Sequence, residues 1–416
     1  MSYILFDAHN FYVSAELVFR PDLLGRPVVV IGSNDGCVIS RSQKAKDIGI
    51  KMGEPAHFVR EEFWRDRVKF FSANFPLYGD MSARMMSVID SLVPRQIAYS
   101  VDEVFATCSG MSPAQLDALA TQVRHQVLQY TGLPIGSGIA PTLTLAKVAS
   151  YLAKRVYRTD SFAIYSDEQR LDALRSTPVG EVWGVGPAYS AKLTAAGVST
   201  AHELAMADPA DLLAHFPVGM RRTQIELQGT SAIDIGDPSV PRQMINVGRS
   251  FGQAVETLDE LAPAFASFAM IASEKLNRQR SVCGALRAYL RPASGSQVRS
   301  GAVTSTFEIR TGDPRAIAGA AVDSAARLFR TGVQYSKGGI CLFDLDQPDQ
   351  CVQSSLFDTH DVDGSRISTL MTGINGRFGR GTLSVARTLG SNKWKPKAEM
   401  LSGTSTTDIT KLPVAF

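Results

Sequence analysis

Residues 3–12 of this 416-residue chain read YILFDAHNFY, and residues 97–105 read IAYSVDEVF. Both stretches are rich in β-branched and aromatic residues, which predicts strands that carry Asp7 and the pair Asp102 and Glu103. A carboxylate on a strand is costly to bury unless a cation neutralises it. Two divalent metals about 4 Å apart, held by such carboxylates, are a standard device for phosphoryl transfer. The three acids therefore predict a two-metal site.

Adjacent residues on a strand face opposite sides of its sheet. On this basis we expect one of Asp102 and Glu103 to share a metal with Asp7 and the other to lie at the rim of the site. Metal binding would relieve both the loss of hydration and the repulsion between the carboxylates.

Composition sets the broad class. A chain of 416 residues is too long for one core and predicts roughly two to four domains. With 44% apolar and 20% charged residues it is typical of globular proteins, and a net charge of +3 neither implies nor excludes a nucleic-acid partner. The five cysteines are scattered without a Cys-x-x-Cys pair, so they indicate neither a disulfide framework nor a zinc site. We see no signal peptide and no membrane span, and expect a cytoplasmic protein.

The first half of the chain predicts an α+β arrangement. After the strand at 3–7, Asn10 is a candidate helix cap, and residues 21–74 form an insert of two short strands and a helix. Residues 75–165 then alternate between the two types, with helices expected at 78–92, 112–130 and 142–155 and strands at 97–108, 135–140 and 161–165. This order predicts a sheet covered by helices on one side.

The second half is predicted to contain further domains. Residues 168–235 are helical with short loops, and Gly184 and Gly186 lie between two of the expected helices. Residues 242–346 follow a strand–helix–strand–strand–helix–strand pattern and carry more Lys and Arg than Asp and Glu. A polar linker at 347–363 and a small terminal module at 364–416 complete the chain.

The residues around Asp7 suit a nucleotide. A strand that ends in a carboxylate and turns directly into a helix presents free backbone N–H groups, which would receive triphosphate oxygens. Phe11 and Tyr12 place two rings in the same region, although Phe11 is equally compatible with a core position. The cations that could form a phosphate clamp are Arg41, Lys46, Lys147 and Lys154, each of which could instead be a solvated surface charge.

Several motifs in order resemble one family. They are YILFDAHNFY (3–12), NDGCVI (34–39), GIKMGEP (49–55), FSAN (71–74), LYGDMS (77–82), YSVDE (99–103), GIAPTLTLAK (138–147), GRGTL (379–383) and MLS (400–402). Together they resemble Y-family translesion DNA polymerases, and in particular the bacterial UmuC type, the catalytic subunit of DNA polymerase V. The resemblance runs essentially from end to end.

The resemblance implies an α+β multidomain fold with the right-hand polymerase architecture. Its parts would be a ferredoxin-like palm, small fingers, a helical thumb with a helix-hairpin-helix, an α+β little finger and a C-terminal UmuC-like module. The corresponding residues would be 1–20 and 75–167 for the palm, 21–74 for the fingers, 168–235 for the thumb, 242–346 for the little finger and 364–416 for the module.

The resemblance also implies roles for single residues. Asp7, Asp102 and Glu103, with the main-chain carbonyl of Ala8, would bind two Mg²⁺ ions. Tyr12 would exclude a 2′-hydroxyl and so select deoxynucleotides. Phosphates would be held by Asn10, Phe11, Ser40, Arg41, Lys46 and Lys154, and Cys37 and Ile39 would cover the nascent base pair.

The partners that the resemblance implies are primer-template DNA, dNTPs, a UmuD-type dimer, a RecA filament and the sliding clamp. Gly184 and Gly186 would contact the DNA backbone, and Gln353, Leu356 and Phe357 resemble a clamp-binding peptide within a linker that could also fold back on its own domain. The implied activity is low-fidelity synthesis past damaged bases in the SOS response.

One position departs from the family pattern. Some members have an aromatic residue and an arginine on the insert's helix where this chain has Gln43 and Lys46. Lysine keeps the charge but loses the bidentate fork of arginine, and no role is predicted for Gln43.

Two rival functions remain at this point. A nucleotide cyclase also places two-metal carboxylates on a palm-like sheet, but has no use for a thumb or a basic downstream domain. A catalytically inactive polymerase-like scaffold in a DNA repair complex would share the fold. Such scaffolds are expected to lose one or more carboxylates, whereas this chain has all three.

Overall fold

The computed structural model describes residues 2–235, 241–347, 362–379, 381–403 and 406. The chain forms two units. The first comprises Met1–Gly32, Gly36–Gly236 and Met400–Phe416, and the second comprises Ser33–Asp35 and Asp237–Glu399.

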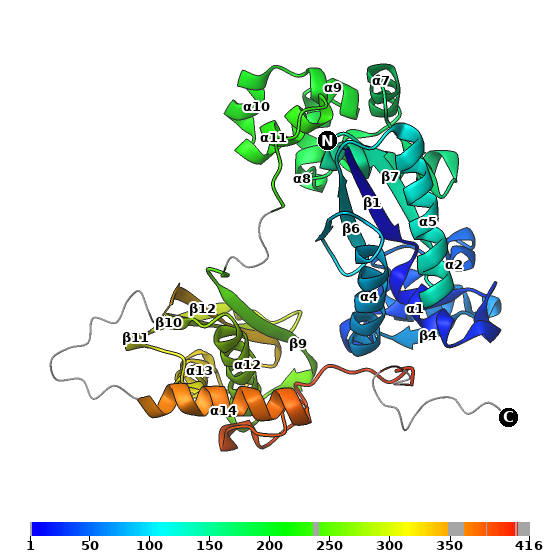
Figure 1. Ribbon diagram of the computed structural model, residues 1–416. Coiled ribbons are helices and arrows are strands. Elements are labelled where there is room, and N and C mark those ends of the chain that lie inside the picture. The colour runs from blue at the N-terminus through cyan, green and yellow to red at the C-terminus, as the bar shows by residue number, and fades with distance from the viewer. Residues whose placement is uncertain (1, 236–240, 348–361, 380, 404–405, 407–416) are drawn as a thin grey trace. The chain divides into compact units, whose positions relative to one another are not determined.

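A five-stranded sheet with the order β5-β6-β1-β7-β8 is the centre of the first unit (Figure 1). β1 runs antiparallel to both of its neighbours, while β8 is parallel to β7. The strands are β1 (Ser2–Ala8), β5 (Gln96–Ala98), β6 (Glu103–Cys108), β7 (Ile135–Ala140) and β8 (Ser161–Ala163).

The expected strands over 97–108 are two, β5 and β6, but the expectation that Asp102 lies in a strand is wrong. The chain turns between β5 and β6, and the N–H groups of Tyr99 and Ser100 both donate to the carbonyl of Glu103, at 3.1 Å each. Asp102 therefore lies in a hairpin turn, and only Glu103 belongs to a strand. The Ser100 hydroxyl holds the turn by donating to the Asp102 carboxylate at 2.6 Å.

Alternate residues of β1 pack against different helices. Ile4 and Phe6 lie in a core with α4 (Phe75–Asp90) and α5 (Pro113–Thr131). Tyr3 and Leu5 lie in a second core with α6 (Leu143–Tyr151). The sheet is thus covered on both faces and not on one.

Gly138 of β7 is the reason that α6 can cover the second face. A Cβ at this position would lie 2.2 Å from the carbonyl oxygen of Ala146 and 2.5 Å from the nitrogen of Ser150. The helix backbone therefore sits directly on the strand, which a sequence pattern of apolar residues does not reveal.

The helix that follows β1 begins without its expected cap. α1 (Phe11–Val18) starts after Asn10, whose backbone is left-handed with φ 50° and whose side chain makes no capping hydrogen bond. The hydroxyl of Ser14 instead donates to the carbonyl of His9 at 2.6 Å. The expected cap position of Asn10 is confirmed, but its side chain does not cap the helix, and its left-handed backbone makes the sharp turn from strand to helix.

A three-stranded sheet with the order β3-β2-β4 follows, with a small core of its own. The hydroxyl of Ser42 caps the helix α2 by accepting from the N–H of Ala45 at 3.2 Å. The elements are β2 (Val28–Ile31), β3 (Val38–Arg41), α2 (Gln43–Asp47), α3 (Ala56–Glu62) and β4 (Lys69–Ser72), with 3-10 turns at Pro21–Leu23, Ser33–Asp35 and Trp64–Asp66.

Short helices complete the first unit. They are fixed to α6 by the buried Glu226, whose carboxylate accepts from the N–H of Thr144 at 2.9 Å and whose carbonyl accepts from the hydroxyl of Thr142 at 3.0 Å. The helices are α7 (Asp167–Arg175), α8 (Pro187–Ala195), α9 (Ala201–Met206), α10 (Pro209–His215) and α11 (Val218–Leu227), with a 3-10 turn at Val179–Glu181.

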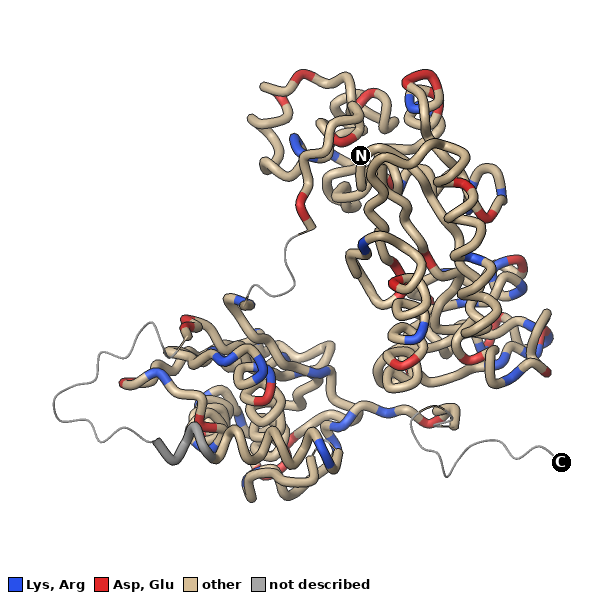
Figure 2. Tube along the Cα trace, viewed as in Figure 1, with Lys and Arg blue, Asp and Glu red and all other residues tan. Residues whose placement is uncertain are grey.

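The second unit has the predicted strand–helix–strand–strand–helix–strand order. Its four-stranded sheet has the order β11-β10-β12-β9, and α12 and α13 pack on it. Lys and Arg positions occur along this sheet and its helices as well as in the first unit (Figure 2). The elements are β9 (Ile245–Val255), α12 (Leu258–Arg278), β10 (Val282–Pro292), β11 (Gly301–Thr311), α13 (Pro314–Leu328) and β12 (Tyr335–Asp346).

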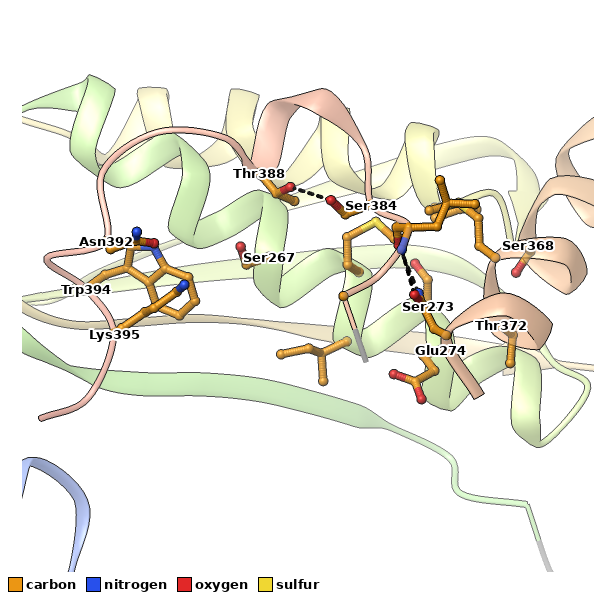
Figure 3. A pocket seen from close by; sticks show the side chains of 17 residues that line it. Ser267, Ser273, Glu274, Ser368, Thr372, Ser384, Thr388, Asn392, Trp394 and Lys395 are labelled. Atoms are coloured by element: carbon orange, nitrogen blue, oxygen red, sulfur yellow. Dashed lines mark hydrogen bonds between the residues drawn. The ribbon is translucent and has the colours of Figure 1, made fainter. Parts of the chain in front are cut away.

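The second unit ends with α14 (Val362–Phe378) and a 3-10 turn at Ala386–Thr388. A cavity of 270 Å³ lies between α12, α14 and the loop after α14 (Figure 3). Trp394 closes one end by packing edge-on against Phe268, with ring centroids 5.4 Å apart. From Met400 onward the chain belongs to the first unit.

The expected α+β right-hand architecture is confirmed by these sheets and helices. Within the described ranges, no helix combines the length and the apolar character needed to cross a membrane.

We expect Gly138→Ala to destabilise the first unit strongly. The added methyl would meet the backbone of α6 and not a flexible side chain, so the free energy of unfolding should fall by about 3 kcal/mol. Thermal and urea unfolding measure the change. Gly79→Ala is the matched control, because Gly79 is exposed on α4 with open space around it, and it should leave stability equal or raise it by up to about 1 kcal/mol. Equal unfolding midpoints for the two variants would contradict the close helix–strand contact.

Candidate active site

The three predicted acids lie side by side where β1 ends and β6 begins. Asp7 and Glu103 are direct partners in the antiparallel register, so their side chains share one face of the sheet. The N–H of Ala8 donates to the carbonyl of Asp102 at 2.9 Å, which holds the turn against the end of β1. The negative charge of Asp102 is close enough to raise the pKa of both other acids.

Two lysines on one side of a helix pair with Glu103 and Asp7. Lys147 of α6 donates to both carboxylate oxygens of Glu103 at 2.9 Å. Lys154 lies two turns further on, in a π-helical continuation at Leu152–Tyr157, with its Nζ 2.5 Å from Oδ2 of Asp7. π-helical turns are rare and often occur at functional sites.

Burial raises the pKa of Asp7 above its ordinary value although Lys154 opposes the shift. Burial also raises the pKa of Glu103, again against the effect of Lys147. The lysines therefore compensate only part of the cost of removing these carboxylates from water. A site of this kind favours a stronger cation.

Lys147, one of the four candidate phosphate cations, is held on Glu103 and is not among the residues that line the cavity beside the acids. Its ammonium group lies among three rings, 4.5 Å from the centroid of Tyr99, 5.6 Å from that of Trp183 and 6.0 Å from that of Phe105. The indole N–H of Trp183 donates to the hydroxyl of Tyr99 at 2.9 Å, which closes the cage. Such cation–π contacts hold Lys147 toward Glu103 and away from the open cavity.

A cavity of 1000 Å³ opens beside the carboxylates. Its lining includes most of the residues that the sequence assigns to a nucleotide, and these come from the β1–α1 turn, from β3 and α2, and from the π-helical segment. They are Ala8, Asn10, Phe11, Tyr12, Ile39, Ser40, Arg41, Lys46, Asp102 and Lys154, together with Gln43, whose amide donates to Asp47 at 2.8 Å.

Ser40 joins two walls of this cavity. Its hydroxyl donates to the carbonyl of Asn10 at 3.2 Å and accepts from the N–H of Val13 at 3.3 Å. The first N–H groups of α1, at Phe11 and Tyr12, have no acceptor within the helix itself. The start of α1 is thus fixed to β3 with donors at the end that faces the cavity.

Five cations line the cavity and are called here the cation group: Arg41, Lys46, Lys154, Arg155 and Arg158. Burial lowers the pKa of Lys46, and the charges of Arg155, Arg41 and Lys154 lower it further. Burial and the charge of Arg155 lower the pKa of Arg41 in the same way. Cations that repel one another in a partly buried site indicate that a polyanion binds there.

Sequence reasoning missed two of these basic residues. Arg155 and Arg158 line the cavity together with Lys154. The only local signal was their place directly after Lys154. Their orientation depends on the π-helical turn and on the left-handed backbone of Arg158, with φ 53°, and neither feature has a sequence signature of its own.

His9 lies in the same wall and is held uncharged. Burial, followed by the charge of Lys154, lowers its pKa to about 4, although Asp160 opposes the shift. Its ring packs over Gly136, where a Cβ would lie 2.9 Å from the ring carbon Cε1. A neutral imidazole adds no further positive charge to the cation group.

Tyr12 presents its ring to the cavity from a cluster of aromatic residues. Its ring centroid lies 4.7 Å from that of Tyr78, 5.6 Å from that of Phe11 and 6.3 Å from that of Phe75, with the last pair edge-on. Phe11 is buried and Tyr12 is half-buried. Phe11 therefore serves the core as well as the cavity, whereas Tyr12 has a free side.

Other predicted site residues lie away from this cavity. Cys37 is exposed in an isolated bridge with Pro55 and is not part of the described lining. Gly184 and Gly186 are exposed before α8, Gly184 with a left-handed φ of 89°. Gln353, Leu356 and Phe357 lie outside the described residues.

The chemistry of the acids fits a divalent cation. Carboxylates and a main-chain carbonyl are the oxygen donors that Mg²⁺ prefers, and Asp7, Ala8, Asp102 and Glu103 supply them at the joined ends of β1 and β6. Within the described residues no three such side chains are already arranged as a metal cage. Lys147 and Lys154 instead pair with carboxylate oxygens of Glu103 and Asp7.

Comparison with family models assigns this chain. Residues 6–151 match the impB/mucB/samB family, and residues 242–356 match the C-terminal domain of the same family. The chain belongs to this family. It is a UmuC-type Y-family DNA polymerase, a DNA-directed DNA polymerase. Residues 365–415 match a domain of unknown function.

Curated relatives match over nearly the whole length. Protein MucB of Salmonella typhimurium is 37% identical over 99% of both chains, and protein UmuC of the same organism is 37% identical over 97% of this chain and 98% of its own. DNA polymerase IV of Desulfatibacillum aliphaticivorans is 27% identical over 91% of this chain and 95% of its own.

Solved structures share the fold of this polymerase. A Y-family DNA polymerase chimera of Dbh and Dpo4 superposes with a TM-score of 0.68 at 16% identity, covering 83% of this chain and 100% of the chimera. An insertion ternary complex of Dbh DNA polymerase gives a TM-score of 0.55 at 16% identity, with the same coverage. The family's fold also implies dependence on a divalent metal in general.

The depressed pKa of His9 makes the polymerase sensitive to acid. Its folded pKa of about 4 lies below the ordinary 6.5, so the unfolded chain takes up the proton first. The contribution of neutral His9 to the free energy of unfolding is present in full above pH 6.5. It falls by about 3 kcal/mol as the pH decreases from 6.5 to 4. We expect His9→Gln to flatten the unfolding free energy over this window. His125→Gln changes an exposed histidine and is the control, which should keep the wild-type pH profile. Equal pH profiles for His9→Gln and the wild type would contradict the lowered pKa of His9.

Proposed function

We propose that this polymerase performs low-fidelity, template-directed DNA synthesis past damaged bases by two-metal-ion nucleotidyl transfer, within SOS mutagenesis. The observation that carries the proposal is the pairing of β1 with β6, which brings Asp7, Asp102 and Glu103 to the edge of a cavity surrounded by cations.

Asp7, Asp102, Glu103 and the carbonyl of Ala8 would hold two Mg²⁺ ions. Bound metal would activate the primer 3′-hydroxyl and offset the charge of the triphosphate and the leaving pyrophosphate. The raised pKa values of Asp7 and Glu103 support this assignment, since each carboxylate has lost more hydration than its lysine replaces. Lys154 would exchange Asp7 for a phosphate oxygen when the nucleotide binds, because it lines the cavity.

The cavity would receive the incoming dNTP. The N–H groups of Asn10 and Phe11 with Ser40, Arg41, Lys46 and Lys154 would bind its phosphates, and the cations Arg155 and Arg158 add to this set. Tyr12 would lie under the sugar, where its ring leaves no room for a 2′-hydroxyl. Cys37 and Ile39 would cover the base pair, and their small side chains would leave space for damaged templates.

The thumb and the little finger would hold DNA. We assign the palm to residues 1–20 and 75–167, the fingers to 21–74, the thumb to 168–235 and the little finger to 242–346. The exposed Gly184 and Gly186 would let a phosphate approach the N–H groups at the start of α8. The excess of Lys and Arg in 242–346 would follow the phosphates of the duplex.

Three protein partners belong to the proposal. They are a UmuD-type dimer, a RecA filament and the sliding clamp, the last bound through Gln353, Leu356 and Phe357. The support is the similarity to proteins named UmuC and MucB over nearly full length.

We expect Asp102→Ala to abolish primer extension with Mg²⁺ while binding to primer-template DNA survives. The substitution removes a proposed metal ligand but none of the Lys and Arg that would contact DNA phosphates. Gel-based extension and fluorescence anisotropy measure the two properties. Asp90→Ala removes an exposed carboxylate at the end of α4 and should extend primers like the wild type. Equal extension by Asp102→Ala would remove the catalytic assignment.

We expect Tyr12→Ala to incorporate ribonucleotides that the wild type rejects, because removal of the ring opens space beside the sugar. Tyr12→Phe retains the ring and should retain sugar discrimination, which separates the steric effect from any effect of the hydroxyl. The measurement is the ratio of kcat/KM for a dNTP to that for its rNTP on one template. An unchanged ratio in Tyr12→Ala would exclude Tyr12 as the gate.

A further inference from the structure

The segment Met400–Gly403 packs on the first unit far from its place in the sequence. The N–H of Ser72, the last residue of β4, donates to the carbonyl of Met400 at 3.0 Å, and the N–H of Met400 donates back to the hydroxyl of Ser72 at 2.9 Å. The Met400 side chain packs on the core of the three-stranded sheet. This segment, named here the tail, is therefore hydrogen-bonded in a defined position beside β4.

Ser402 of the tail uses both hydrogen-bonding functions of its hydroxyl. It accepts from the side-chain amide of Asn74 at 2.9 Å and donates to the carboxylate of Glu16. Asn74 and Glu16 are both buried, with 4% and 1% of their surfaces exposed. A polar tail residue therefore satisfies two interior groups of the palm region.

Asn74 determines where α4 begins. Its carboxamide oxygen accepts from the N–H of Leu77 at 3.3 Å and so caps the helix that carries Phe75 and Tyr78. Its amide nitrogen is the group that reaches Ser402. The tail therefore contacts the first turn of the helix whose rings pack on Tyr12.

Glu16 makes the second connection. Its carboxylate also accepts from the hydroxyl of Tyr78 at 2.7 Å, and Tyr78 is almost fully buried. Tyr12 and Glu16 are one turn apart on α1, so both face Tyr78. The ring of Tyr78 then packs on the ring of Tyr12, with the centroids 4.7 Å apart.

We propose that Ser402 is a positioning residue for sugar selection, acting through Glu16 and Tyr78 on the ring of Tyr12. The inference rests on the proposed function, since Tyr12 matters here as the sugar gate. Ser402 bonds the carboxylate of Glu16 but is not among the residues that line the nucleotide cavity. Its effect is to hold the carboxylate that orients Tyr78, so that the gate ring has a rigid support on its inner side.

The experiment measures sugar discrimination in the full-length chain carrying Ser402→Ala. Loss of the hydroxyl leaves the Tyr78 support less restrained, so the dNTP-to-rNTP ratio of kcat/KM should fall by about fivefold, the effect of one net hydrogen bond. The change should appear in the KM for nucleotides more than in kcat. Ser402→Thr keeps the hydroxyl and should restore the ratio. Ser384→Ala makes the same change in the second unit, where the hydroxyl contacts Thr388, and should leave the ratio unchanged.

A double-mutant cycle distinguishes positioning from general stabilisation. Tyr78→Phe removes the hydroxyl that bonds Glu16, so adding Ser402→Ala to it should lower the ratio no further. Additive effects, or a wild-type ratio in Ser402→Ala, would overturn the proposal while primer extension and the Tyr12→Ala result stand. Failure of the proposed function gives a different pattern, in which Tyr12→Ala also keeps the wild-type ratio or no extension occurs, and the proposal falls with it.

Discussion

Three carboxylates that share one small region of low hydration are the constraint on which the first unit depends. Asp7 and Glu103 repel each other and Asp102, and burial raises the pKa of the first two even beside lysines. The sheet can tolerate this only because α6 and its π-helical end bring Lys147 and Lys154 to the same face. That approach in turn requires Gly138, which allows the helix backbone to contact the strand. The three carboxylates lower stability, and the two lysines offset part of that cost. Charge clusters of this kind are common where charge is needed for chemistry.

Local sequence patterns predicted the elements that carry this cluster. The apolar run before Asp7 predicted β1, and the order of strands and helices in 242–346 predicted the second sheet, because alternation and cap residues act over a few positions. The same patterns failed where a contact between distant segments decides the geometry. Asp102 lies in a turn held by Ser100, Lys147 is held by a ring cage that includes Trp183, and the second face of the sheet is covered by α6. No short-range signal reports those contacts.

The cation group likewise divides into residues that the sequence predicted and residues that only the structure revealed. Its members Arg41, Lys46 and Lys154 were predicted from residue type and from family motifs, whereas Arg155, which lines the cavity and lowers the pKa of Arg41 and Lys46, was not. Electrostatic consequences of this kind depend on burial and on distance, which a sequence does not contain. The tail is the extreme case, since Met400 and Ser402 contact residues more than three hundred positions earlier.

The size and lining of the cavity bear on selectivity. Under the proposed function, a space of 1000 Å³ that includes Ile39 and Ser40 in its lining would give little shape discrimination against an altered base. Discrimination against a ribose must then come from a separate, stiff element. Tyr12 fulfils that need only if its ring cannot yield, and its stiffness has an identifiable source in Tyr78, which is buried, packed on Tyr12 and bonded to Glu16. If the proposed function holds, base tolerance and sugar strictness could coexist in one cavity, because the wide space would admit the base while the aromatic cluster fixed through Glu16 would support the sugar side.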